Sequence, residues 1–219
     1  MDKAQAELLR RAASVIGHDL RNPLAVINNS SYFVRAKLGK GLDPKVEKHL
    51  KIIESEIARA DGLLSDMLTF SRPYEPALET KVVDEVVSDA VAAYAAPEGG
   101  KVDLKLGAKG AAAKFDVKGL HDSVKRLLDN AFYAQEDKGT VKVATSAGKD
   151  GVVVSVADSG KGVDAKIEGV MFEAFMTTKP KGMGLGLSLA RKYLEGVGGA
   201  VTHETGPKGS TFRLVLPKA

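Results

Sequence analysis

The chain has 219 residues, no cysteine and a formal net charge of +4 at pH 7. Its length suits a small domain followed by a medium-sized one, and the lack of cysteine excludes disulfides and thiolate metal sites. The thin positive charge and an aromatic content of 5% argue against a nucleic-acid-binding surface, and no apolar run approaches the roughly 20 residues that span a bilayer.

The distribution of glycine divides the chain. Only 4 of the 23 glycines precede Pro76, so the first third is predicted to be helical and the remainder rich in loops. Pro73 and Pro76 would end a helix and favour extended backbone. We therefore expect a domain of residues 1–72, a linker of residues 73–76 and a domain of residues 77–219.

Two amphipathic helices are predicted within residues 2–72. Residues 39–42 interrupt the pattern, and Asp43 can cap the second helix with Pro44 in its first turn. In the first helix, apolar residues recur mostly at steps of three and four. These residues are Leu8, Ala12, Ile16, Leu20, Leu24, Ile27, Val34 and Leu38.

The second helix has the a/d spacing of a coiled-coil or helix-bundle seam. Its seam positions are Val46, Leu50, Ile53, Ile57, Ala60, Leu64 and Met67. A hairpin of two such helices leaves apolar faces that it cannot bury alone, so we expect a homodimer in which two hairpins form a four-helix bundle. The alternative is a hairpin that packs only against the rest of its own chain.

A histidine, a carboxylate and an amide lie close together in the first helix. At about 100° per residue, His18 points away from the apolar stripe, and Asn22, four residues later, shares its face. A neutral imidazole is a nucleophile near physiological pH, and Asp19 can hold a proton on one ring nitrogen so that the other attacks. We predict that these three residues are catalytic; the alternative is that His18 is an ordinary solvated side chain.

The second domain alternates strands and helices without a regular βαβ repeat, which predicts an α/β sandwich with one mixed sheet and helices on one face. Helices are expected at residues 82–96, 123–137 and 185–196. Strands are expected at residues 102–106, 114–117, 140–146, 151–157, 200–204 and 211–216.

Three sites in this domain could bind a phosphorylated ligand. Asp158-Ser159-Gly160-Lys161-Gly162 follows a strand, and Gly182-Met183-Gly184-Leu185-Gly186-Leu187 opens a helix, where glycines let backbone N–H groups approach phosphates. Asn130 carries an amide oxygen of the kind that Mg²⁺ binds. Taken singly, the glycine runs also suit flexible turns, and Asn130 also suits a solvated helix face.

Together and in this order, the motifs resemble the catalytic core of two-component sensor histidine kinases. Residues 18–23 resemble the H box of that family, residues 127–131 the N box, residues 158–162 the G1 box, residues 172–175 the F box and residues 182–187 the G2 box. The run from Phe172 into Gly182 is similar to the nitrogen-regulator subtype. The resemblance implies an α+β chain: a dimeric four-helix bundle, then a Bergerat-type α/β sandwich that binds ATP.

The resemblance also implies the chemistry and the setting. ATP would phosphorylate His18 with help from Asp19, the phosphoryl group would pass to an aspartate of a response regulator, and Asn22 would assist a phosphatase step. The cofactors would be ATP and Mg²⁺, the location cytoplasmic, and any membrane attachment would come through a sensor region outside this chain.

Within the ATP-binding domain, the resemblance implies that Asp158 accepts the adenine amino group and that Asn130 holds Mg²⁺ against the phosphates. Lys179 and Lys181 in the lid are candidates for the γ-phosphate. The full set of implied ATP-binding residues is Asn130, Asp158, Gly160, Gly162, Lys179, Lys181, Gly182, Gly184, Gly186 and Leu187.

Two positions depart from the family pattern. Arg126 stands where an asparagine is usual, four residues before Asn130, and Tyr133 stands where many members have a basic residue. These departures suggest a rearrangement of the metal and phosphate contacts; the alternative is that Arg126 lies at the surface and changes little. They motivate an alternative function, a dimeric nucleotide-binding scaffold without kinase activity.

Overall fold

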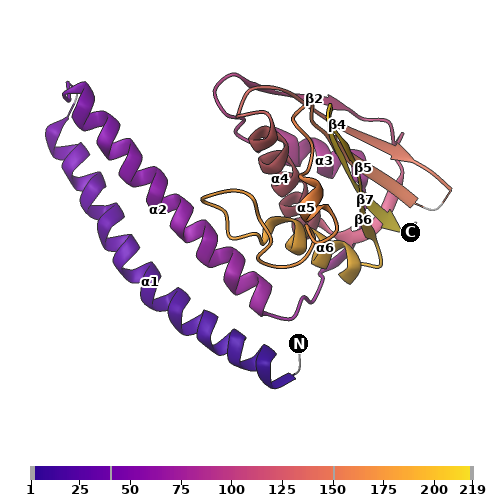
Figure 1. The fold of residues 1–219 in the computed structure, drawn as a ribbon, viewed down its shortest axis with the longest axis horizontal. Helices are drawn as coiled ribbons and strands as arrows, with labels where there is room; N and C mark the ends of the chain where they lie inside the picture. Colours follow the sequence, from indigo (N-terminus) through magenta and orange to yellow (C-terminus); the bar gives the residue numbers. More distant parts are fainter. Residues whose placement is uncertain (1–2, 40, 150, 218–219) are drawn as a thin grey trace. The chain divides into compact units, whose positions relative to one another are not determined.

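A computed structural model describes residues 3–39, 41–149 and 151–217, and the chain divides into two compact units between Pro73 and Tyr74 (Figure 1). Tyr74, which the sequence places in a linker, packs in the second unit with its ring 4.9 Å from that of Tyr193. Across the described residues, no helix combines the length and the apolar character needed to cross a membrane.

The first unit is a helical hairpin. Helix α1, Lys3–Leu38, and helix α2, Pro44–Ser71, run side by side (Figure 1). Asp43 caps α2 as predicted, because its side chain accepts a hydrogen bond of 2.7 Å from the backbone N–H of Lys45. Pro23 lies inside α1 without ending it. Since proline has no N–H, it cannot donate the usual helical hydrogen bond to the carbonyl of Asp19.

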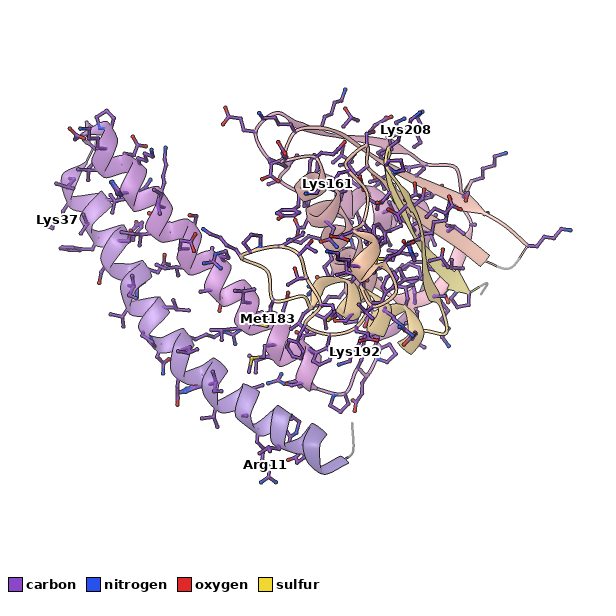
Figure 2. The ribbon with its side chains drawn as sticks, viewed as in Figure 1. Arg11, Lys37, Lys161, Met183, Lys192 and Lys208 are labelled. Atoms are coloured by element: carbon purple, nitrogen blue, oxygen red, sulfur yellow. The ribbon has the colours of Figure 1, made fainter. Side chains whose placement is uncertain are left out.

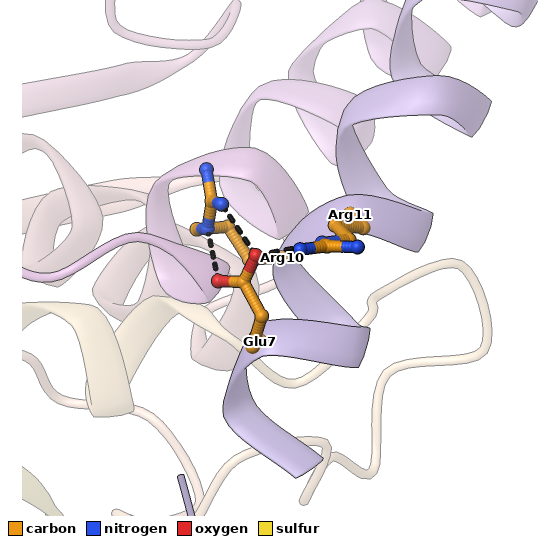
Figure 3. A network of polar contacts seen from close by, with 3 residues as sticks. All are labelled: Glu7, Arg10 and Arg11. Atoms are coloured by element: carbon orange, nitrogen blue, oxygen red, sulfur yellow. Dashed lines mark hydrogen bonds and ion pairs between the residues drawn. The ribbon is translucent and has the colours of Figure 1, made fainter. Parts of the chain in front are cut away.

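Glu7 forms ion pairs with two arginines near the start of α1. Glu7 accepts hydrogen bonds from Arg10 Nε at 2.8 Å and from Arg11 Nε at 2.7 Å (Figure 3). These hydrogen bonds, led by that from Arg10, lower the pKa of Glu7 to about 2. The pairs are exposed to solvent and contribute little to stability.

The hairpin buries only part of its apolar surface. Among the α1 residues whose burial is described, Ala13, Gly17 and Ser31 are buried, and a side-chain carbon on Gly17 would lie 3.0 Å from Leu68 of α2. Along the predicted apolar stripe, Ile16, Leu20, Ile27, Val34 and Leu38 are exposed. The hairpin by itself therefore leaves this stripe open.

The second unit confirms the predicted α/β sandwich with a mixed sheet. Its five strands follow the order β2-β4-β5-β7-β6; β2 and β4 are parallel, and the other neighbours are antiparallel. The strands are β2 Gly100–Lys105, β4 Gly139–Ala147, β5 Gly151–Ala157, β6 Ala200–Gly206 and β7 Gly209–Pro217.

Three main helices cover one face of this sheet (Figure 1). They are α3 Val83–Ala92, α4 Val117–Ala134 and α6 Gly186–Gly196. Leu127 and Leu128 of α4 and Leu189 of α6 are fully buried. Alternate residues of β5 and β7 are buried, as expected for strands with one face against a helical layer.

The expectation of one sheet was incomplete. A second sheet of two antiparallel strands joins β1, Leu78–Val82, to β3, Ala112–Asp116. β1 was missed because it is short and mostly exposed, so it lacks an apolar alternation.

Three helices also differ from the prediction. Helix α3 ends at Ala92, four residues before its predicted end. Helix α4 begins at Val117, six residues before the predicted start, because Asp116 accepts a hydrogen bond of 2.9 Å from the N–H of Gly119 and caps the helix. A short helix, α5, Ala165–Glu168, was not predicted.

Candidate active site

His18 projects from α1 into solvent, with 76% of its side chain exposed. Its Nδ1 lies 3.2 Å from Asp19 Oδ1. A proton on Nδ1 that is donated to this carboxylate leaves the lone pair of Nε2 available for attack. Asn22, one turn further along α1, is exposed as well. The structure thus places the three predicted residues on one stretch of accessible helix surface.

Arg21 anchors the His18 segment to α2, a role that the sequence analysis did not detect. Its Nε donates to Asp61 Oδ1 at 2.8 Å, and its Nη2 donates to Ser65 Oγ at 2.8 Å. Both partners are more than one helix length away in sequence, so local spacing carried no signal for these contacts. These two hydrogen bonds hold α1 in one rotation about its own axis beside the histidine.

Asp158 lies at the end of β5 and is half-buried. Its Oδ1 accepts hydrogen bonds from the backbone N–H groups of Gly160 at 2.8 Å and Ser210 at 3.3 Å. Burial raises the pKa of Asp158, and the two hydrogen bonds oppose this rise. The carboxylate is therefore held rigidly as an acceptor at the rim of the sheet.

The loop after Asp158 closes tightly on the turn between β6 and β7. Gly162 has φ 75°, and a side-chain carbon there would lie 2.2 Å from the carbonyl oxygen of Gly206. Lys161, which precedes it, is exposed (Figure 2). Only glycine fits both the backbone conformation and the close approach at position 162.

Further residues that support this loop were also missed. Thr205 Oγ1 accepts from the N–H of Val163 at 2.8 Å and lies 2.9 Å from Ser210 Oγ. Gln135 Oε1 accepts from the N–H of Ser159 at 3.1 Å. A hairpin turn between residues 206 and 209 could have been recognised from its Gly-Pro-Lys-Gly sequence, but the pairing of β5 with β7 could not.

The structure brings Asn130 and Lys179 together. Lys179 Nζ donates to Asn130 Oδ1 at 2.7 Å and lies 3.4 Å from the carbonyl oxygen of Asp129. The same ammonium lies 4.5 Å from the ring centroid of Tyr133. Burial lowers the pKa of Lys179, whereas the charges of Asp129 and Asp137 raise it. Lys179 is therefore a partly buried side chain with defined partners on α4.

The segment between Phe175 and Gly184 forms a loop with a closed base, because the N–H of Phe175 donates to the carbonyl of Gly184 at 2.9 Å. We call residues 175–184 the lid. Gly184 has φ 74°, and a side-chain carbon there would lie 2.5 Å from the carbonyl carbon of Phe175. Lys181 and Gly182 are exposed within the lid.

Beyond the lid, α6 begins at Gly186. A side-chain carbon on Gly186 would meet no atom within 4 Å, so the backbone at this first position of the helix borders open space. Leu187 is partly buried against the core and fixes this turn. The free N–H groups of a first helical turn attract anions such as phosphate.

These residues fit a metal-bound nucleotide. Asn130 Oδ1 already accepts from a cation, the ammonium of Lys179, and the start of α6 is open to phosphate. Among the residues described here, no three histidine, aspartate or glutamate side chains gather to hold a metal ion. Mg²⁺ would therefore need phosphate oxygens and waters beside Asn130, which is its usual coordination in nucleotide sites.

Two segments of the chain match known protein families. Residues 8–75 match the His Kinase A (phospho-acceptor) domain. Residues 115–219 match the histidine kinase-, DNA gyrase B-, and HSP90-like ATPase domain. The chain belongs to the histidine kinase family. The phospho-acceptor domain separates this kinase core from the gyrase and HSP90 branches of the ATPase family.

Several curated sensor proteins are similar to this kinase core over nearly its whole length. The C4-dicarboxylate transport sensor protein DctB of Rhizobium meliloti is 28% identical over 97% of this chain and 35% of its own length. The signal transduction histidine-protein kinase AtoS of Escherichia coli is 28% identical over 98% of this chain and 36% of its own length. The chain thus spans about a third of each of these relatives.

Solved structures share the fold of the kinase core. Full-length ShkA in complex with AMPPNP superposes with a TM-score of 0.73 at 21% identity, over 95% of this chain and 47% of that chain. The Acinetobacter baumannii histidine kinase AdeS superposes with a TM-score of 0.58 at 17% identity, over 91% of this chain and 97% of that chain.

Proposed function

We propose that this kinase core uses Mg·ATP to phosphorylate its own His18. The observation that carries the proposal is the exposed imidazole whose Nδ1 lies 3.2 Å from Asp19 Oδ1, in a chain that also matches the histidine kinase-type ATPase domain. Nε2 of His18 attacks the γ-phosphorus, the bond to the β,γ-bridging oxygen breaks, and ADP leaves. Asp19 stabilises the positive charge that develops on the ring and helps to remove the Nδ1 proton.

The second unit supplies the nucleotide. Asp158 accepts a hydrogen bond from the adenine amino group, and Gly160 and Gly162 shape the pocket around the base. Asn130 would hold Mg²⁺ against the phosphates, where the bound ion would offset negative charge on the transferring group. The other ATP-binding residues of the proposal are Lys179, Lys181, Gly182, Gly184, Gly186 and Leu187. Transfer requires that the γ-phosphate come within reach of His18, and the linker of residues 73–76 has to permit that approach.

Incubation with Mg²⁺ and ATP labelled at the γ-phosphate tests the proposal. Label that is stable in base and lost in acid identifies a phosphohistidine. The competing function is a nucleotide-binding scaffold without kinase activity, which Arg126 and Tyr133 favour because they depart from the family pattern. That function predicts ATP binding without incorporation of label.

Nucleotide affinity is expected to fall as the pH decreases. The fall should begin at a higher pH than the titration of an ordinary aspartate would give. Burial raises the pKa of Asp158, so its carboxylate takes up a proton earlier as the pH falls, and protonation removes the acceptor for the adenine amino group. Binding titrations with a fluorescent ADP analogue across pH 4–8 measure this effect. Asp158→Asn should bind weakly and without this pH dependence; a wild-type affinity that holds steady down to the usual aspartate range would contradict the assignment.

We further propose that a response-regulator receiver domain docks beside His18 in the cytoplasm and receives the phosphoryl group on an aspartate. Exposed Val15, Val26 and Phe33 support this, because helical phase places them within about 80° of His18 and gives the partner an apolar surface next to the phosphohistidine. Asn22 shares this face and positions water for the reverse phosphatase step. The sequence of residues 172–180 supports the nitrogen-regulator subtype.

The kinase core is proposed to act as a homodimer through the open stripe of the hairpin. Isolated amphipathic hairpins gain stability when a second hairpin covers such a stripe and completes a four-helix bundle. Ile27 lies near the centre of the stripe and is 48% exposed, whereas its neighbour Val26 is 65% exposed and points about 100° away.

Ile27→Asp is expected to convert the dimer into a monomer, because it would place a charge inside the bundle. Val26→Asp is the matched control and should remain dimeric. Sedimentation equilibrium measures the mass of each variant. A monomeric wild type, or an equal loss of the dimer in both variants, would contradict this interface.

A further inference from the structure

The side chain of Lys179 reaches from the lid onto α4. Its ammonium occupies a seat made by three groups: Asn130 Oδ1 at 2.7 Å, the Asp129 carbonyl oxygen at 3.4 Å and the face of the Tyr133 ring, whose centroid is 4.5 Å away. Asn130 and Tyr133 are three residues apart and therefore lie on the same face of the helix. The lid thus delivers a positive charge to the side chain expected to hold a metal ion.

The backbone of the lid presents Lys179 to this seat. The N–H of Lys179 donates to Thr177 Oγ1 at 2.9 Å, and its carbonyl accepts from the N–H of Gly182 at 3.1 Å. These two bonds form a turn with Lys179 at its centre. A lysine on a flexible loop would pay a large entropy cost to hold one position, and the turn removes part of that cost.

Tyr133 contributes the face of its ring. The carboxylate of Asp129 binds other groups than the Lys179 ammonium. Its Oδ2 accepts from Lys125 Nζ at 2.7 Å, and its Oδ1 accepts from Tyr94 Oη at 3.0 Å. The nearest partners of the Lys179 ammonium are therefore neutral. An aromatic face stabilises a cation that has lost part of its water without neutralising it, so the ammonium keeps its full charge for an incoming phosphate.

An ammonium and a metal ion that both contact Asn130 Oδ1 would repel each other. The Lys179 ammonium lies 2.7 Å from this oxygen, and a bound Mg²⁺ would lie about 2.1 Å from it, so the two cations would come within about 5 Å of each other. Unlike a carboxylate, the amide oxygen carries no net charge to offset their repulsion. Metal binding at Asn130 should therefore expel the ammonium.

We propose that Tyr133 is a positioning residue that seats the Lys179 ammonium at Asn130 as a built-in cation, and that the metal ion displaces this ammonium when it binds with nucleotide. The inference rests on the nucleotide site of the proposed function. Without metal, the seated ammonium contacts the nucleotide phosphates. With metal, Lys179 leaves Asn130, and the lid is released from α4.

The test compares binding of a fluorescent ADP analogue to the full chain in EDTA and in excess Mg²⁺. Lys179→Met should lower the affinity about tenfold in EDTA and by less than about threefold in Mg²⁺, because the lost contact is one that the metal replaces. Tyr133→Leu should lower it about threefold in EDTA only. Tyr133→Phe keeps the ring face and should bind like the wild type in both media.

Three outcomes would overturn the proposal. Equal losses for Lys179→Met in the two media would show that Lys179 acts independently of the metal. An equal defect in Tyr133→Phe and Tyr133→Leu would show that the ring face does not seat the ammonium. A wild type that binds the analogue in neither medium would refute the nucleotide site itself, and the inference with it. Thermal melting of each variant separates loss of binding from unfolding, and Lys179→Met, which changes a surface loop, keeps the comparison valid if Tyr133→Leu does not fold.

Discussion

We expect His18→Ala to lower incorporation of the γ-phosphate label by more than about 1,000-fold. The variant removes the nucleophile of the proposed reaction. The chain keeps three other histidines, of which His203 packs against the rings of Phe172 and Phe212 in the second unit. His203 is therefore not available as a substitute acceptor. The measurement is acid-labile, base-stable label on the protein after incubation with Mg·ATP.

Asn22→Ala is the matched control, because Asn22 lies one turn from His18 on the same exposed face. This variant should label normally but should dephosphorylate a phosphorylated response regulator more slowly. Nucleotide binding should be unchanged in both variants. Persistent base-stable label in His18→Ala would contradict the assignment of the acceptor, and equal loss of labelling in both variants would show that the mutations disturb the helix.

Gly184→Ala should destabilise the second unit and remove nucleotide binding. The left-handed conformation at φ 74° disfavours any residue with a side-chain carbon, and that carbon would lie 2.5 Å from the carbonyl carbon of Phe175 and 2.6 Å from the N of Met176. The backbone at the base of the lid must shift to accept it. Conformational penalty and overlap together cost about 2–4 kcal/mol of unfolding free energy. Urea denaturation and binding of the ADP analogue measure the two effects.

Gly186→Ala separates folding from phosphate contact. Gly186 begins α6, and an added side-chain carbon meets no atom within 4 Å, so the variant should be as stable as the wild type or slightly more stable. Its nucleotide affinity should still fall, because the methyl group would stand where bare backbone meets phosphate. Gly184→Ala with wild-type stability would contradict the tight lid base, and Gly186→Ala with wild-type affinity would contradict the phosphate contact.

Local patterns in the sequence were sufficient to predict the hairpin. The observed helices α1 and α2 end and begin on either side of the predicted break, and Asp43 caps α2 as expected. The central strands β4 and β5 and helix α6 also lie where they were predicted. These elements are long, strongly periodic or bounded by glycine and proline, so each is determined by residues that are neighbours in the sequence.

Elements without such a signal were predicted poorly. β1 is five residues long and mostly exposed, and the first turn of α4 contains Gly119 and polar residues that hide its helical character. For β1 the physical reason is tertiary, whereas α4 starts early because of the local cap by Asp116. β1 is stabilised by pairing with β3, and the paired residues lie 30 to 38 positions apart in the chain.

By itself, the sequence determined the order of the motifs, the exposed face of His18 and the residues that could meet a nucleotide. Only the tertiary structure decided which of them touch. Arg21 bonds to Asp61 across 40 positions, Lys179 to Asn130 across 49 and Ser210 to Asp158 across 52. Helical phase and strand alternation specify which face a side chain occupies, whereas contacts across such distances depend on how helices pack, how strands are ordered and where a loop folds back.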